Sequence, residues 1–598
     1  MRNKGISLIV LIISILVIII LSGAIILNVT KNNPIQNAKE AVFKSDLATI
    51  QEQLDIYAIN ETTKIMDLFD KENMNGKVSD FIPSLKKYDD ELLVVNGKLQ
   101  YIGNNTRRAE LLAEIFGNND TVVEVGGLKY NKPDLAYLAE STTRAIKWDN
   151  SNNESEIALS LAKNDTSWYD YSTKKWANIY TNNNGNKAYW VWIPRYAYKI
   201  YNPHTTTTQK INIKFLNGVS NVAADGSSLD GYTVHPAFTF GDKQLTGIWV
   251  AKYEASSSDP NRIETSGSSA GANLGGGNDT SLQVRILPNV YSWRNITVGN
   301  SQTVSMNMTS NSGSVGSNIN VDTHLIKNVE WGAVAYLCQS QYGEEPWINP
   351  YGDVVDSSRK MKTGYSGTSK DNSMLTEGSV NLSQYNTVNG VKASTTGNIY
   401  GVYDMNGGAW ERTASLINNG NVNIGTYGKS EHIESNKIKQ DYIKYYDIYE
   451  PGDEEKENGP YYGTAGVTLW NAGRNESYNI IRKRLTDATY AKFALKKGDA
   501  LWEVSNSTSY YGIYTTGQEA SGNLRNWLID TVRDASQGAQ TSRGWSDDYM
   551  LIGYGSIPWL QRGGGAYSNN GAGIFGVYSD MGSPQSVYSF RPVLVVNN

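Results

Sequence analysis

The chain has 598 residues, 39% of them hydrophobic and 19% charged, which is the composition of a globular protein. This length predicts several domains rather than one compact core. The formal net charge of -5, with no basic stripe of interleaved aromatic residues, argues against nucleic acid as a partner.

Cysteine and histidine are rare, with one Cys and four His in the whole sequence. A single Cys cannot form a disulfide within the chain, and the scattered histidines lack the ligand spacing of a structural zinc site. In the segment VEWGAVAYLCQ, Trp331, Ala335 and Cys338 share one helical face. We therefore expect Cys338 to be a buried core residue.

The chain opens with MRNKGISLIVLIISILVIIILSGAIILNVTK, which carries no charge from Ile6 to Val29. At about 1.5 Å per helical residue this run spans a hydrocarbon core of roughly 30 Å. Because Arg2 and Lys4 precede the run, we expect a single-pass membrane protein with a short cytoplasmic N-terminus and an extracellular C-terminal domain. A signal peptide would have a shorter apolar region, so residues 6–29 are assigned to a transmembrane helix.

The residues MRNKG followed by ISLIVLIISI resemble the class III leader of type IV pilins and pseudopilins. This resemblance implies that residues 1–5 are a prepilin leader, that a prepilin peptidase cuts between Gly5 and Ile6, and that Ile6 is then N-methylated. It also implies pilin subunits as partners. The family usually has Glu at the fifth mature position, where this chain has Val10, and some members without that Glu are proposed to sit at filament tips. A plain membrane anchor is the alternative interpretation.

Beyond the apolar run, hydrophobic residues recur at steps of four and three. They are Phe43, Leu47, Ile50, Leu54 and Tyr57. This stripe predicts an amphipathic helical extension over residues 30–60, like the long helix of pilins. The segment LLVVNGKLQYIG (92–103) predicts a β-hairpin that turns at Asn96-Gly97. We expect residues 61–185 to form a small α+β spacer region.

A series of recognisable segments follows over residues 186–598. AYWVWIPRYAYKI (188–200) and LTGIWVAKYEAS (245–256) predict strands, and HLIKNVEWGAVAYLCQSQYG (324–343) holds a predicted helix. GNIYGVYDMNGGAWERTAS (397–415) is rich in turns and aromatic residues, and the chain closes with PWLQRGGGAYSN and SFRPVLVV.

This series is similar to the formylglycine-generating (sulfatase-modifying factor) family, a variant of the C-type-lectin fold. The most specific match is YGVYDMNGGAWERT, and Arg562-Gly563-Gly564 and Phe590-Arg591 match the later motifs. The resemblance implies an α+β protein whose large, irregular C-type-lectin-like domain covers 186–598, with an insertion at 416–545.

Enzymes of this family oxidise a substrate cysteine by means of two cysteines that follow the RGGS motif. Counted from Arg562, those positions are Ser568 and Gly573 in this chain. A hydroxyl binds copper(I) far more weakly than a thiolate does. We therefore expect no oxidase chemistry and a protein that is not an enzyme.

The resemblance also implies a calcium site, built in the family from an Asn and a Glu with backbone carbonyls. Glu411 remains in this chain, but the Asn position is Gly408. Since calcium takes roughly six to eight oxygen ligands, Asp404, Asn406 and carbonyls would have to complete the shell. A purely structural Glu411 is the alternative, and no other cofactor is expected.

The segment GAYSNNGAGIFGVYSDMGSPQSVYS (565–589) has no His, Cys or Lys and only one carboxylate, Asp580. This inventory is poor for acid–base or nucleophilic catalysis. It suits a binding face, because Tyr supplies rigid contact area while Ser, Asn and Gly supply adaptable hydrogen bonds. The candidate ligand-binding residues are Tyr567, Ser568, Asn569, Asn570, Tyr578, Ser579 and Tyr588. A glycan and a protein remain open as ligands.

The sequence thus predicts a non-catalytic binding protein of the bacterial cell surface or of a type IV pilus, resembling a minor pilin or tip subunit that acts in adhesion. Two alternatives come from other classes of protein. One is a membrane-anchored enzyme with altered chemistry on the same fold. The other is a structural minor pilin that primes filament assembly.

Overall fold

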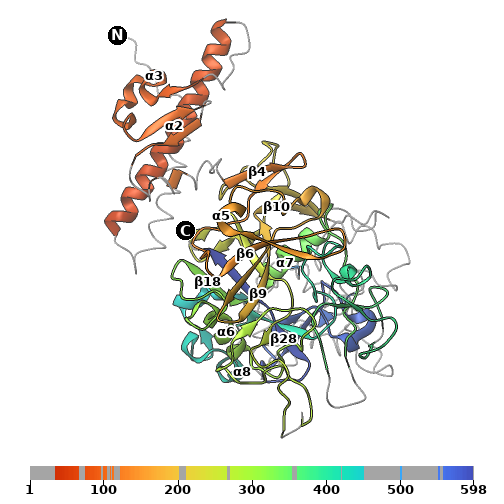
Figure 1. The fold of residues 1–598 in the computed structure, drawn as a ribbon. Coiled ribbons are helices and arrows are strands. Elements are labelled where there is room, and N and C mark those ends of the chain that lie inside the picture. The colour runs from red at the N-terminus through yellow and green to blue at the C-terminus, as the bar shows by residue number, and fades with distance from the viewer. Residues whose placement is uncertain are drawn as a thin grey trace, which may run out of the picture. The chain divides into compact units, whose positions relative to one another are not determined.

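The computed structural model describes residues 34–65, 74–95, 98–103, 108, 111–112, 121–200, 211–265, 270–352, 360–372, 374–418, 420–449, 498–500, 548, 550–551 and 557–596. The described residues fall into two compact units (Figure 1). The first belongs to Met1–Thr121 with Asn217–Val222, and the second to Val122–Leu216 with Ala223–Asn598. The protein is mixed α+β and rich in strands, as the sequence predicted.

The first unit is a long helix packed on a small sheet. Helix α2 (Pro34–Ile65) lies along the antiparallel strands β1 (Gly76–Lys77), β2 (Leu92–Val95) and β3 (Lys98–Tyr101), as Figure 1 shows. The helix buries the apolar stripe seen in the sequence, namely Phe43, Leu47, Ile50 and Leu54. The helix from Pro34 and the two hairpin strands agree with the elements predicted here, while residues 30–33 and the turn itself lie outside the described residues.

The predicted leader, the processing pair Gly5 and Ile6, and the transmembrane helix all lie in residues 1–33, outside the described residues. Among the helices that are described, none combines the length and the apolar character needed to cross a bilayer. Helix α2, for example, carries exposed Lys39 and Glu52 on the faces away from its sheet.

The second unit is built around a seven-stranded sheet in the order β18-β29-β15-β9-β8-β6-β7. Its strands are β6 (Thr143–Trp148), β7 (Glu154–Ala158), β8 (Asn178–Asn183), β9 (Asn186–Pro194), β15 (Gly247–Ala251), β18 (Val321–Leu325) and β29 (Pro592–Val596). The closing strand β29 lies between β18 and β15, with every residue buried. Burial on both faces explains why it reads as a continuous apolar run.

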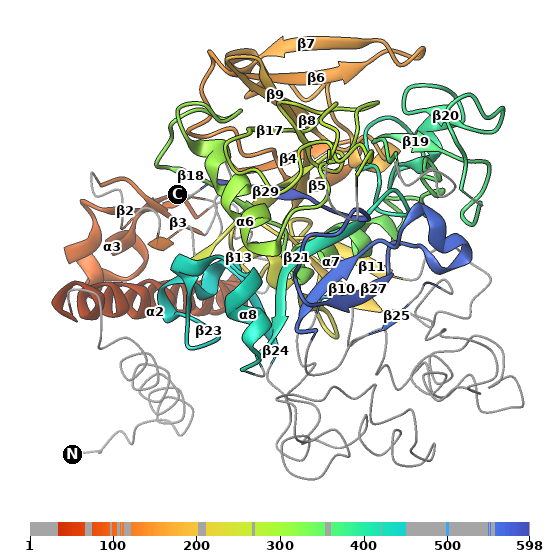
Figure 2. The same cartoon turned by 90° about the horizontal axis from the view of Figure 1, so that it is seen from below.

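The same unit contains a six-stranded sheet in the order β24-β21-β26-β27-β25, with β28 also paired to β21. The strands are β21 (Trp410–Ile417), β24 (Asp447–Tyr449), β25 (Met550–Leu551), β26 (Trp559–Arg562), β27 (Val577–Asp580) and β28 (Tyr588–Phe590). Figure 2 shows the teal strand β21 and the blue strand β27 in this region, and β26 pairs with both of them. The helix predicted between residues 324 and 343 is α7 (Asn328–Cys338), which buries Cys338.

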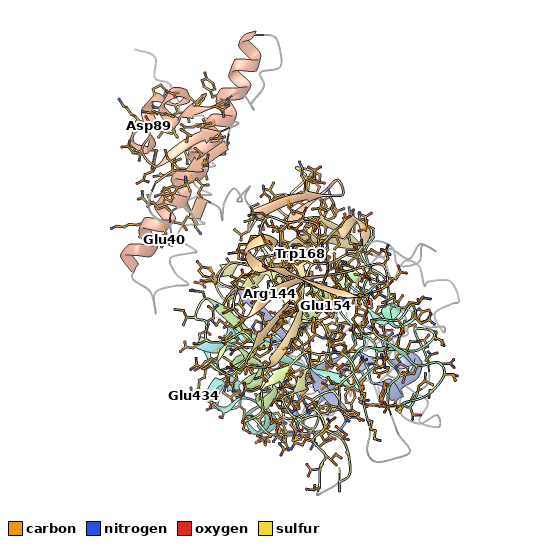
Figure 3. The ribbon with its side chains drawn as sticks, in the orientation of Figure 1. Glu40, Asp89, Arg144, Glu154, Trp168 and Glu434 are labelled. Carbon is orange, nitrogen blue, oxygen red and sulfur yellow. The ribbon has the colours of Figure 1, made fainter. Side chains whose placement is uncertain are left out.

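The structure places the boundary of the large domain earlier than residue 185. Strands β6, β7 and β8 belong to the seven-stranded sheet and not to a spacer. The polar stretch at the predicted boundary is a tight hairpin, in which Asn184 and Gly185 adopt φ of 52° and 82° between β8 and β9. Positive φ at both central residues is the mark of a type I′ turn. Buried aromatic residues such as Trp168, labelled in Figure 3, join these strands to the core.

The predicted insertion at 416–545 is also partly integral to the fold. Strand β21 continues to Ile417, and β24 pairs with it in parallel. Residues 419, 450–497 and 501–545 of the insertion lie outside the described residues. The sheet therefore needs at least the residues up to Tyr449.

One buried ion pair joins the two sheets. Arg591 lies between β28 and β29, and its Nε and Nη2 donate to Glu411 Oε2 and Oε1 at 2.9 and 2.5 Å. Its Nη1 also donates to the carbonyl of Ala251 at 2.7 Å, and Nη2 donates to that of Tyr403 at 2.8 Å. Glu411 belongs to the six-stranded sheet and Ala251 to the seven-stranded one, so a single guanidinium holds both.

Replacing Arg591 by Lys removes the planar fork and leaves Glu411 buried with an imperfect partner. We predict that Arg591→Lys lowers the free energy of unfolding of the second unit by about 3 to 5 kcal/mol. Denaturation followed by tryptophan fluorescence measures this unit alone, because all 15 Trp lie after residue 121.

The matched control is Arg262→Lys, in the exposed ion pair with Asp279. It should cost about 1 kcal/mol or less, because solvent screens such pairs. Equal losses in the two variants would contradict a special role for Arg591.

Candidate functional site

Three of the predicted contact residues converge from separate elements. Tyr567 lies on η14 (Ala566–Gly571), Tyr578 on β27 and Tyr588 on β28. Burial raises the pKa of Tyr588, and nearby Asp580, Tyr567 and Tyr578 raise it further. Trp410 stands opposite Tyr588 in the sheet, and its ring centroid lies 5.7 Å from that of Tyr578, so these two tyrosines flank the same residue. The three tyrosines therefore belong to one site.

Strand register explains why they share a face. Gln561 on β26 stands directly opposite Arg412 on β21 and Tyr578 on β27. Trp410 on β21 stands opposite Tyr588 on β28. Directly opposed residues in a sheet point to the same side. We call this surface the tyrosine face and define it by Tyr567, Tyr578, Tyr588, Trp410, Arg412, Gln561 and Asp580.

The other predicted contacts are placed differently. Ser579 is fully buried, because it alternates with Tyr578 along β27 and so points to the opposite side of the sheet. Ser568 is half-buried, and its hydroxyl accepts a hydrogen bond from the Gly565 amide at 3.3 Å. Asn569 and Asn570 lie in η14, but their side chains are outside the described residues. Tyr567 is exposed, at 38%.

The aromatic rings of the tyrosine face are tilted against one another. The ring centroids of Trp410 and Tyr578 are 5.7 Å apart at an interplanar angle of 45°. The Arg412 guanidinium lies 5.1 Å from the ring centroid of Tyr588, within cation–π range. Arg412 is also ion-paired with Asp580, with 3.2 Å between Nη1 and Oδ1. The charges beneath the rings therefore neutralise each other.

Several polar atoms of the tyrosine face are buried without a partner. Gln561 is fully buried, and neither its Nε2 nor its Oε1 makes a hydrogen bond within the described part of the chain. The same holds for Arg412 Nε and Asp580 Oδ2. Since buried polar groups are nearly always hydrogen-bonded, each such atom needs an explanation, such as a water molecule or a ligand.

Glycines of the RGGG motif shape the loop that carries Tyr567. Gly563 and Gly564 adopt φ of 86° and 73°, in the left-handed region that favours glycine. A Cβ added to Gly564 would lie 2.4 Å from the Cα of Ala572. No side chain therefore fits where the loop folds back on itself.

The predicted calcium ligands already have protein partners. Glu411 is held by Arg591. Asp404 Oδ1 accepts hydrogen bonds from Asn349 Nδ2 at 2.9 Å and from the Gly364 amide at 2.8 Å. Across the residues that the structure describes, no group of three or more His, Cys, Asp or Glu is placed to hold a metal ion. Asn406 Nδ2 donates to the Pro346 carbonyl at 2.9 Å, while its Oδ1, the atom that would bind a cation, has no partner among the described residues. Calcium at this position stays a prediction.

Sequence inspection missed Glu254, which lies beside this acidic group. A Cβ added to Gly408 would lie 2.3 Å from Glu254 Oε1, so this carboxylate fills the space next to Gly408. Glu254 Oε1 accepts a hydrogen bond from the Ala409 amide at 2.8 Å, while Oε2 has no partner within the described residues. Burial, followed by the charges of Asp404 and Glu411, raises the pKa of Glu254 well above its usual range.

The two positions at which the sequence resemblance would place catalytic cysteines are Ser568 and Gly573, and neither carries a thiol. A Cβ at Gly573 would lie 1.9 Å from the carboxylate of Asp548, so a side chain at this position would require that carboxylate to move. Asp548 is ion-paired with Lys370 at 3.0 Å. Cys338, the one cysteine of the chain, is buried, and its Sγ lies 2.8 Å from the carbonyl oxygen of Glu344.

A hollow of about 620 Å³ lies beside the start of α7. Lys327, Lys444 and Tyr446 are among its lining residues, and none of the lining belongs to the tyrosine face. Both of its ammonium groups face carboxylates of the protein itself. Lys327 Nζ lies 3.2 Å from Glu330 Oε1, and Lys444 Nζ lies 4.0 Å from Asp322 Oδ2. Both ammonium groups of this hollow are therefore already paired, whereas the tyrosine face has buried polar atoms without a partner among the described residues.

Comparison of the chain with protein-family models and with curated proteins finds no match. The functional argument therefore rests on the residues of the tyrosine face.

The raised pKa of Glu254 has a measurable consequence. Its folded-state pKa lies above the ordinary value of 4.5, so its contribution to stability is present below pH 4.5 and is lost as pH rises. We predict that Glu254→Gln, which mimics the protonated acid, flattens the decline in Tm between about pH 5 and pH 8. Thermal unfolding across this pH series is the measurement.

Glu434→Gln, at the exposed position on β22 (Ile433–Glu434) that is labelled in Figure 3, is the control and should leave the wild-type slope unchanged. The same slope in Glu254→Gln and in the wild type would contradict a protonated Glu254.

Proposed function

We propose that this protein is a non-catalytic binding protein whose ligand contacts the tyrosine face. The observation that carries the proposal is the convergence of Tyr567, Tyr578 and Tyr588, from three elements, over buried polar atoms that have no partner among the described residues. Rigid aromatic side chains beside hydrogen-bond donors and acceptors that lack a partner are typical of a recognition surface.

Catalysis on this face is disfavoured by the state of its charged groups. Arg412 and Asp580 form an ion pair with each other. Burial raises the pKa of Tyr588, so its phenol stays protonated and cannot act as a general base near neutral pH. An enzyme with altered chemistry would need its reactive groups elsewhere in the chain.

The proposed setting is the bacterial cell surface, where the sulfatase-modifying-factor-like domain is presented on a pilin-like anchor. Residues 6–29 would cross the membrane, and processing between Gly5 and Ile6 by a prepilin peptidase would allow incorporation beside pilin subunits. The chain order supports this proposal, because α2 follows the apolar run after only a few residues, as in the long pilin helix. The protein would then act in adhesion.

The first experiment is a binding screen of the full chain against glycan and cell-surface protein arrays. We predict that the combined variant Tyr567→Ala, Tyr578→Ala and Tyr588→Ala weakens binding at least about tenfold, since truncating an aromatic anchor costs about 2 kcal/mol or more. Tyr137→Ala is the control, because this tyrosine is 51% exposed and lies outside the tyrosine face.

Binding that survives in the triple variant would move the site away from the tyrosine face. If the folded wild type binds neither array, the proposal fails. The structural minor pilin is then the better account, and filament assembly by a chain that lacks the second unit from Val122 onward tests it.

A further inference from the structure

The tyrosine face contains buried polar atoms that have no hydrogen-bond partner among the described residues. Two of them are donors and two are acceptors. Gln561 contributes one of each through Nε2 and Oε1, Arg412 contributes the donor Nε, and Asp580 contributes the acceptor Oδ2. Gln561 lies between Arg412 and Tyr578 in the register of the sheet. A ligand that satisfies this set must both donate and accept within a small area.

The charge of the same residues is balanced. The only charged side chains that define the tyrosine face are Arg412 and Asp580, which are ion-paired with 3.2 Å between Nη1 and Oδ1. A charged ligand group would have to compete with this pair and would find no opposite charge in surplus. The face therefore suits a neutral ligand.

A hydroxyl group donates and accepts at one atom, whereas a backbone N–H only donates and a carbonyl only accepts. Adjacent hydroxyls can thus satisfy both atoms of the single Gln561 amide. The apolar C–H surface of a sugar ring can meanwhile pack on the faces of Tyr567 and Tyr578.

We propose that the ligand of the tyrosine face is a neutral carbohydrate and that Gln561 is the residue that selects it. This inference rests on the proposed binding function and names its ligand class. Gln561 is fully buried, so binding requires a neighbouring side chain to move, and we assign this movement to the half-buried Tyr578, which flanks Gln561 in the sheet. Rotamer changes of this kind are common at binding surfaces.

The test measures glycan binding and stability together in Gln561→Met, which keeps the volume and removes the amide. The full chain is kept in a detergent without a sugar head group and applied to arrays of neutral, sialylated and sulfated oligosaccharides and of cell-surface proteins. We expect binding to neutral glycans that Gln561→Met weakens about tenfold or more. The Tm should not fall, because the amide has no hydrogen-bond partner to lose among the described residues.

Gln302→Met is the matched control. This glutamine is also buried, but its Oε1 accepts a hydrogen bond from the Leu325 amide at 3.1 Å. Here the Tm should fall while glycan binding stays unchanged. The opposite changes in stability separate a ligand-directed glutamine from a structural one.

Four results would overturn the inference. Binding restricted to sialylated or sulfated glycans contradicts a neutral ligand, and unchanged glycan binding by Gln561→Met contradicts its selecting role. Binding only to proteins, lost in the tyrosine triple variant, removes the carbohydrate and leaves the proposed function standing. If the folded protein binds neither array, both proposals fail.

Discussion

The guanidinium of Arg591 connects both sheets of the second unit at one buried point. It donates to Glu411 in the six-stranded sheet and to the carbonyl of Ala251 in the seven-stranded sheet. The chain passes from β28 to β29 through this residue, so the last two strands take their places on either side of it. Removing one partner of a buried pair leaves a charge without compensation, which makes this contact a strong constraint on the fold.

The tyrosine face depends on that constraint. Tyr588 begins the short strand β28, which pairs with β21, and Arg591 follows directly after this strand. Side chains alternate between the two sides of β21, so neighbouring residues of this strand have different roles. Glu411 points inward to the ion pair, while Trp410 and Arg412 point to the tyrosine face. The same segment thus anchors the fold on one side and forms the proposed binding surface on the other.

Much of this arrangement could be predicted from local sequence, because its causes are local. The apolar stripe of α2, the β2–β3 hairpin, α7 and the glycines after Arg562 all follow from spacing or from backbone freedom. Residues that meet only through strand pairing could not be predicted. Gln561 joins Tyr578 through register, Ser579 turns inward by alternation, and Glu254 meets Gly408 across a long stretch of chain. The predicted domain boundary after residue 185 falls on the Asn184-Gly185 hairpin, because turns and linkers have a similar polar composition.

The most direct test of the central constraint is amide hydrogen exchange in the wild type and in Glu411→Gln. If the buried pair joins both sheets, protection should fall together in residues 410–417, 588–590 and 592–596. Residues 34–65, which form α2 in the other unit, should keep their protection. Loss confined to 410–417, or no loss in any of the three segments, would contradict the account.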